Sequence, residues 1–93
     1  MKVQIKAALL SGKKVVTTEE ALHGKMYKSV FEYRPESGHV RIDDYIVYPN
    51  GTYKERFGED NGMELTLDDG INCIIRMQGD GCKVEIKEKR LKQ

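Results

Sequence analysis

Two runs of strand-forming residues, 40–48 and 52–57, flank the tripeptide Pro49-Asn50-Gly51. Proline presets φ for the first central position of a turn, and Asn and Gly tolerate the left-handed conformation that tight turns often need. Tyr, Ile, Val and Phe are frequent in both runs, and these residues favour extended backbone. The stretch therefore predicts a β-hairpin, and this hairpin constrains the rest of the chain.

All five tyrosines and both phenylalanines lie between Tyr27 and Phe57. Aromatic side chains bury large areas, so the bulky part of the core is expected in this region. A tyrosine hydroxyl needs water or a hydrogen-bond partner. Some of the tyrosine rings are therefore expected at the surface of the sheet.

The pair Asp43-Asp44 interrupts the apolar pattern of the strand over residues 40–48. Strict alternation would place Asp44 on the same face as Val40 and Ile42, where an unpaired carboxylate is costly. We therefore expect a β-bulge at the two aspartates, or a tight turn at the same place. Two acids in such a bulge would also be candidates for a cation or partner site.

The N-terminal region predicts one or two short helices. Val3, Ile5 and Ala7 alternate as in a strand, so a strand remains an alternative at residues 1–11. Helix propensity favours a helix over residues 3–11 that ends at Ser11-Gly12. After an extended piece at 14–17, Thr17 and Glu20 have the spacing of a capping box, and Gly24 would end a second helix.

Alternating apolar residues predict further strands at 26–34, 63–67, 71–77 and 82–86. The first of these should form a meander with the hairpin. The last two should pair with each other, with Met77 opposite Cys82. This register separates Cys73 from Cys82 by about 13 Å, too far for a disulfide, so both cysteines are expected to be free.

These elements predict a single α+β domain over residues 1–93. One or two short N-terminal helices precede about six antiparallel strands, arranged as a meander sheet or a small, partly open barrel. No apolar run is long enough for a membrane span, and no signal-peptide pattern follows the first basic residue. We expect a cytoplasmic protein that does not enter a membrane.

The net charge is +1, but the charges are unevenly distributed. Residues 1–34 and 71–93 carry an excess of Lys and Arg, whereas residues 35–70 carry an excess of Asp and Glu. Either these segments neutralise each other in the fold, or the acidic middle faces a basic partner.

No catalytic or cofactor motif is present. The glycines do not form a phosphate-binding loop, and no Ser or Cys nucleophile has the spacing of a known motif. The spacing of His23, His39, Cys73 and Cys82 matches no zinc pattern. We therefore expect no enzymatic activity, no cofactor and no bound metal.

The favoured hypothesis is a non-enzymatic interaction protein that binds a protein partner, as inhibitors and antidefence factors do. Exposed tyrosines supply contact area at low entropic cost, and acids steer a basic partner. The candidate contact residues are Asp43, Asp44, Tyr45, Tyr53, Glu55, Glu59 and Asp60.

Two alternatives remain open. A homo-oligomer could bind a small anionic or nucleotide ligand at a subunit interface through Lys13, Lys14, Arg34 and Arg41. A single-stranded nucleic-acid-binding module could use the strand at 26–34, which interleaves basic and aromatic residues. The acidic stretch at 35–70 would repel phosphates, which argues against nucleic acid.

The segment Ala7-Ala-Leu-Leu-Ser-Gly-Lys-Lys-Val15 resembles the helix–Gly-Lys-Lys-Val–strand opening of short phage and prophage proteins, including one family that sequesters a cyclic nucleotide signal. The Trp that usually follows in that family is absent here. The resemblance implies a phage or mobile-element origin and transfers no site residue.

Overall fold

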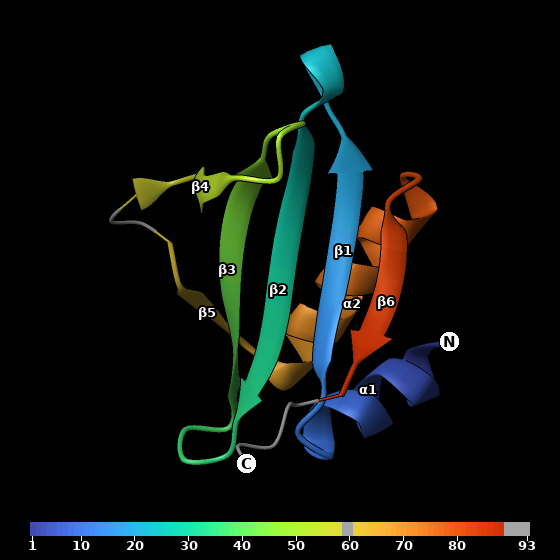
Figure 1. Ribbon diagram of the computed structural model, residues 1–93. Helices are drawn as coiled ribbons and strands as arrows, with labels where there is room; N and C mark the ends of the chain where they lie inside the picture. The colour runs from blue at the N-terminus through green and yellow to red at the C-terminus, as the bar shows by residue number, and fades with distance from the viewer. Residues whose placement is uncertain (59–60, 89–93) are drawn as a thin grey trace.

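A computed structural model describes residues 1–58 and 61–88 (Figure 1). Along the chain the elements are α1 (Lys2–Leu10), β1 (Lys14–Glu20), the short 3-10 helix η1 (Leu22–Gly24), β2 (Met26–Arg34), β3 (His39–Val47), β4 (Tyr53–Glu55), β5 (Met63–Thr66), α2 (Leu67–Gly79) and β6 (Lys83–Lys87).

The six strands form one open antiparallel sheet in the order β4-β3-β2-β1-β6. β5 also pairs with β3, beside its N-terminal half, whereas β4 pairs with the C-terminal half of β3. The α+β class, the antiparallel sheet and the neighbouring positions of β2, β3 and β4 are confirmed. The barrel alternative is wrong, because β4 and β6 lie at opposite ends of the strand order.

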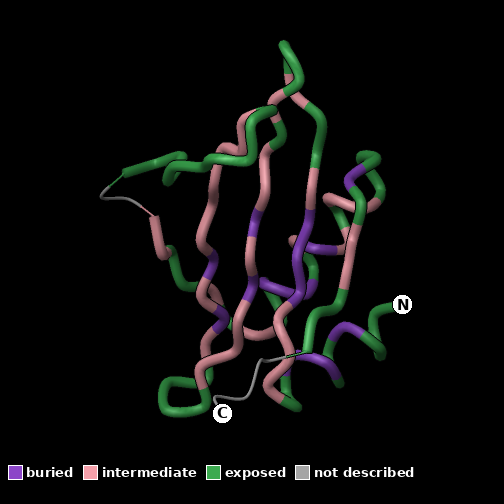
Figure 2. The backbone as a smooth tube through the Cα atoms, in the orientation of Figure 1, coloured by how far each residue is buried: buried purple, intermediate pink, exposed green. Residues whose placement is uncertain are grey.

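Both α-helices lie on the same side of the sheet (Figure 1). The core between the two layers combines residues of the helices with residues of the three central strands, and these positions are purple in Figure 2. Its buried members are Ile5, Ala8, Leu9, Val15, Phe31, Val40, Ile42, Ile71 and Ile74. Within residues 1–58 and 61–88, the other side of the sheet carries no helix, and this difference between the two sides positions the candidate site.

The predicted N-terminal helix and central hairpin are present. The helix expected over residues 3–11 is α1, and the turn after β3 is closed by a hydrogen bond from the Gly51 amide to the Tyr48 carbonyl, 2.9 Å long. Asn50 accepts hydrogen bonds from the amide and the hydroxyl of Thr52. The asparagine thereby stabilises the turn through its side chain.

The second predicted N-terminal helix is wrong. Residues 14–20 form the strand β1 throughout, and only the single turn η1 follows it. The run Val15-Val16-Thr17-Thr18 is β-branched, and such residues favour strands over helices. The capping-box spacing of Thr17 and Glu20 therefore has no helix to cap.

The predicted strand at 71–77 is also wrong, because these residues belong to the helix α2. The Thr66 hydroxyl caps this helix by accepting a hydrogen bond from the Asp69 amide, 3.1 Å long. Cys73 therefore lies on a helix, and the strand register proposed between residues 71–77 and 82–86 does not exist. Both cysteines are free, as expected. The predicted reason, a register between two paired strands, does not apply, because Cys73 lies on α2.

The expected bulge or tight turn at Asp43-Asp44 is absent as well. β2 and β3 pair without interruption, with Val30 opposite Asp43 and Ser29 opposite Asp44. The side chain of Asp44 therefore lies on the helix side of the sheet. It accepts a hydrogen bond from the Ser29 hydroxyl, so the carboxylate has the partner that the sequence argument assumed it lacked.

Candidate functional site

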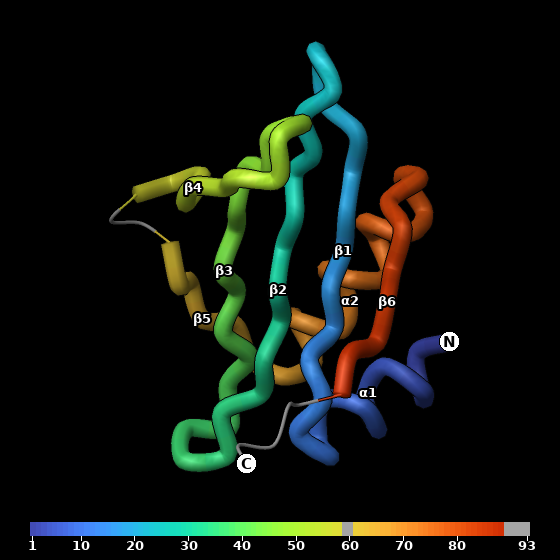
Figure 3. Tube along the Cα trace, in the orientation of Figure 1, coloured from blue at the N-terminus to red at the C-terminus, as the bar shows by residue number. Residues whose placement is uncertain are grey.

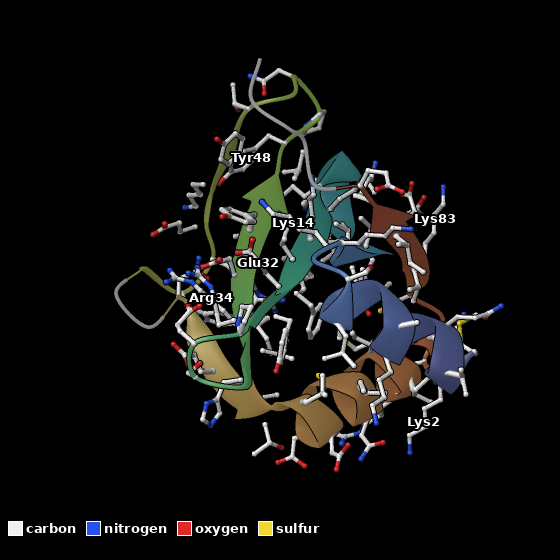
Figure 4. The ribbon with its side chains drawn as sticks, turned by 90° about the horizontal axis from the view of Figure 1, so that it is seen from below. Lys2, Lys14, Glu32, Arg34, Tyr48 and Lys83 are labelled. Carbon is white, nitrogen blue, oxygen red and sulfur yellow. The ribbon has the colours of Figure 1, made fainter. Side chains whose placement is uncertain are left out.

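The side of the sheet without helices is the candidate site, and we call it the open face. Residues that alternate with the core positions lie on it. In Figure 4, Lys14 and Glu32 rise from this face while Lys2 points away on the helix side. The strand registers also place Val16, Thr18, Met26, Lys28, Val30, Arg41, Asp43, Tyr45, Val47, Tyr53, Glu55, Glu64, Glu85 and Lys87 on the open face.

Two tyrosines form the most prominent feature of the open face. Tyr45 of β3 and Tyr53 of β4 pack edge to face, with ring centroids 5.6 Å apart. Tyr53 remains 69 % exposed, and Tyr45 lies opposite Glu55 in the strand register. An exposed aromatic pair on a sheet offers a rigid contact area for a partner.

A shallow hollow of about 210 Å³ lies beside the tyrosines on the open face. Val16, Met26 and Val47 contribute its apolar lining, and Thr18, Lys28, Glu85 and Lys87 complete it. Val47 lies opposite Tyr53 in the register, so the hollow and the tyrosine pair are neighbours. The tyrosine pair and the hollow together form an apolar centre, and charged residues lie around it.

Charges are divided across the open face. Asp43, Glu55 and Glu64 lie on β3, β4 and β5, towards one edge of the sheet, whereas Lys14, Lys28, Lys83 and Lys87 lie on β1, β2 and β6. Figure 4 shows Lys83 at the β6 side. Glu32 on β2 and Glu85 on β6 lie among these lysines, so the acids outnumber the cations only in the β3–β5 part of the face.

Arg41 reduces the negative charge of that acidic part. Its guanidinium pairs with the Asp43 carboxylate at 3.2 Å and lies against Gly62, where an added Cβ would be 2.7 Å from Arg41 Nη2. The φ of +86° at Gly62 favours glycine, and a side chain at this position would displace the flexible end of Arg41. Asp43 therefore offers a partner less free charge than Glu55 does.

The phenol of Tyr45 is held in its protonated form. Partial burial raises its pKa, and the nearby carboxylates of Asp43 and Glu55 raise the pKa further. A protonated phenol can donate a hydrogen bond as well as accept one. Tyr45 can therefore contribute polar specificity as well as apolar area.

Arg56 supports the tyrosine pair from behind the sheet. Its amide donates a hydrogen bond to the Asp44 carbonyl, 2.9 Å long, and its guanidinium lies 3.8 Å from the Tyr27 ring centroid. This stacking ties the segment after β4 to β2. A contact on the helix side therefore lies directly after the strand that carries Tyr53 on the open face.

The structure brings together four of the seven predicted contact residues: Asp43, Tyr45, Tyr53 and Glu55. Asp44 lies on the opposite face of the sheet and is not part of this surface. Glu59 and Asp60 lie outside the described residues.

The four cations predicted for an anionic ligand do not form one free cluster, although Arg41 lies opposite Glu32, the residue that pairs with Arg34. Lys13 lies after α1 and pairs with Glu88 at 3.2 Å, whereas Lys14 rises from the open face (Figure 4). Arg34 pairs with Glu32 at 3.5 Å, and Arg41 pairs with Asp43. Three of the four therefore already have an acidic partner, and the ligand hypothesis stays a prediction.

The apolar hollow is the feature that sequence reasoning missed. Val16 was assigned to a short extended piece that led into a helix, so its place beside Val30 in the sheet was not visible. The alternation of Val16 with Val15, one on each face, was the available signal.

Comparison of the chain with protein-family models, with curated proteins and with solved structures found no match. Within residues 1–58 and 61–88, no helix has the length and apolar character needed to cross a membrane. The same residues contain no cluster of His, Cys, Asp and Glu suited to a metal ion.

Proposed function

We propose that the protein is a non-enzymatic interaction protein, of the inhibitor or antidefence type and of phage or mobile-element origin, which binds a protein partner through a tyrosine surface. We define this surface as Asp43, Tyr45, Tyr53 and Glu55. The observation that carries the proposal is the exposed Tyr45–Tyr53 pair beside an apolar hollow. Aromatic anchors next to a pocket are typical of residues that dominate binding energy at interfaces.

The shape and charge of the surface define the partner's chemistry. The hollow of about 210 Å³ has room for one apolar side chain rather than for a whole small molecule, since ligand pockets usually start near 300 Å³. Glu55 and the partly neutralised Asp43 favour basic residues on the partner at the β4 side of that side chain, whereas Lys28 and Lys87 line the hollow itself. A segment with an apolar anchor next to Lys or Arg fits both requirements.

The test is affinity capture followed by cross-linking, with three forms of the protein. Tyr53→Ala and Glu55→Lys change the surface, whereas Lys54→Ala changes the same strand on the opposite side of the sheet. We expect a captured protein to cross-link near β4, to be lost with Tyr53→Ala and Glu55→Lys, and to be retained with Lys54→Ala. Equal capture by all three variants would eliminate the proposal.

A further inference from the structure

β6 forms one edge of the sheet. It pairs with β1 on one side, and among the described residues no strand pairs with its other side. Its sequence is Lys83-Val-Glu-Ile-Lys87. Unpaired amide and carbonyl groups along such an edge can accept another strand.

Helix α1 extends past this edge in both views of the ribbon (Figures 1 and 4), and the tube in Figure 3 follows the same course. A shallow groove of about 400 Å³ lies between α1 and β6, lined by Gln4, Ala7, Ala8, Ser11, Lys13 and Ile86. Ile86 is 44 % exposed. A strand added beside β6 would therefore rest on α1 and cover Ile86.

The outer side of α1 is apolar as well. Val3, Ala7 and Leu10 are spaced as one helical face, and all three are exposed. Val3 is 80 % exposed and Leu10 is 49 % exposed. This apolar face adjoins the groove through Ala7, so the edge strand and the helix offer one continuous apolar surface.

We propose that a second copy of this chain occupies the edge, with the two β6 strands pairing antiparallel across a two-fold axis. The charges along β6 support this choice of partner. In the register centred on Ile86, Glu85 lies opposite the partner's Lys87 and Ile86 lies opposite its own copy. Opposite charges that face each other across strands stabilise the pair, and the twofold axis makes each such contact twice.

The dimer joins the two sheets into one and brings the two α1 helices together beneath the junction. Their exposed apolar faces then pack against each other or against the added strand. The tyrosine surface lies at the other end of the strand order, on β3 and β4, so it stays free, whereas the hollow beside it shares Glu85 and Lys87 with the dimer contact. This inference goes beyond the proposed function and does not depend on it.

Sedimentation equilibrium over a range of concentrations tests the inference. We expect a species of twice the chain mass of 10.7 kDa, and a Val3→Glu variant that dissociates at least tenfold more readily. Leu22→Glu is the matched control, because Leu22 is also 80 % exposed but lies on η1, away from β6. It should leave the dimer unchanged.

Charge reversal tests the register. Glu85→Lys and Lys87→Glu should each weaken the dimer about tenfold, because every reversal replaces two attractive pairs with two repulsive ones. The double variant restores opposite charges and should recover most of the affinity. Circular dichroism of each variant confirms that the fold is retained.

A monomer at all concentrations would overturn the proposal. A dimer whose dissociation constant is unchanged by Val3→Glu and by the charge reversals would overturn it as well. If the protein stayed monomeric but bound a synthetic extended peptide at β6, the edge would accept a strand of another protein, and the proposal of a second copy would be wrong. A single reversal that weakens the dimer without recovery in the double variant would overturn the register centred on Ile86.

Discussion

Ser29 on β2 donates a hydrogen bond to the carboxylate of Asp44 on β3, across the helix side of the sheet. Thr17 lies beside Ser29 in the next strand, and its hydroxyl points to the Met77 sulfur at 3.8 Å. These three residues form a polar row beside the apolar core. The row lets Asp44 stay in regular strand alternation without a bulge.

The Ser29–Asp44 pair should be measurable as a coupling energy. Ser29→Ala leaves a half-buried carboxylate without its hydroxyl donor and should cost about 1–2 kcal/mol of unfolding free energy. Urea unfolding of Ser29→Ala, Asp44→Ala and the double variant completes a double-mutant cycle. We expect a coupling free energy of about 1 kcal/mol between the two side chains. Additive losses would show that the two side chains do not interact in solution.

Two glycines of α2 should respond in opposite ways to alanine. At Gly70 an added Cβ would lie 3.0 Å from the Cβ of Val40, whereas at Gly79 no atom of the described residues would lie within 4 Å of it. Gly70→Ala should therefore destabilise the protein by about 1–3 kcal/mol through overpacking. Gly79→Ala should be neutral or stabilise by up to about 1 kcal/mol, because alanine favours helix. The melting temperatures of the two variants separate the effect of overpacking at Gly70 from the effect of helix propensity at Gly79.

Stability should fall with pH above the ordinary pKa of a thiol. Burial is the main cause that raises the pKa of both Cys73 and Cys82. As pH rises, the unfolded chain therefore loses its thiol protons before the folded chain does, which favours unfolding. Urea midpoints at pH 7.5 and pH 9.5 should show this fall, and Cys73→Ala/Cys82→Ala should reduce it. If the urea midpoint of the double variant fell as much between pH 7.5 and pH 9.5 as that of the unsubstituted protein, groups other than the two thiols would cause the loss of stability.

Arg56 should control the order of β4 more than the stability of the whole protein. Arg56→Ala removes the stack on Tyr27 and the contact of its guanidinium with the Phe57 ring, and should cost about 0.5–1 kcal/mol. Hydrogen exchange of the β4 amides should accelerate, while that of β2 stays slow. Lys54→Ala is the control on the same strand. Unchanged exchange in β4 would mean that the stack does not position Tyr53.

The central strands could be predicted because the sequence patterns that specify them, alternating apolar residues and turn residues, span only a few neighbouring positions. The Pro49-Asn50-Gly51 turn and the β-branched and aromatic runs on both sides act over a few residues, and tertiary packing reinforces them. Tyr45, Tyr53 and Glu55 lie close together for the same reason, because one hairpin carries all three, and their role as contact residues stays a prediction.

The helix α2 shows where local pattern fails. Ile71, Cys73, Ile75 and Met77 alternate as in a strand, but Ile71 and Ile74 are buried together as on a helix. Short apolar runs fit both periods. Thr66 and Asp69 carried the deciding signal, since their spacing is that of a helix cap. The same spacing at Thr17 and Glu20 was misleading, because the β-branched run favoured a strand there.

The pairing of β1 with β6 could not be inferred from neighbouring segments. It joins residues 14–18 to residues 83–87, and nothing local specifies it. The charge division of the open face depends on this pairing, because it places Lys83 and Lys87 beside β1. The acidic middle and the basic ends are visible in the sequence, but the strands that carry them on the open face follow only from the long-range pairing.

The β1–β6 contact also bears on how the chain reaches its fold. Ordering two segments so far apart in sequence carries a high entropic cost, so such contacts generally form late and lower the folding rate. Until β6 arrives, β1 is itself an exposed edge that carries Val15 and Val16. The most vulnerable species in the folding of this protein is therefore expected to be a nearly complete sheet that lacks its last strand, and exchange of β6 between two such molecules is its most direct route to misassembly.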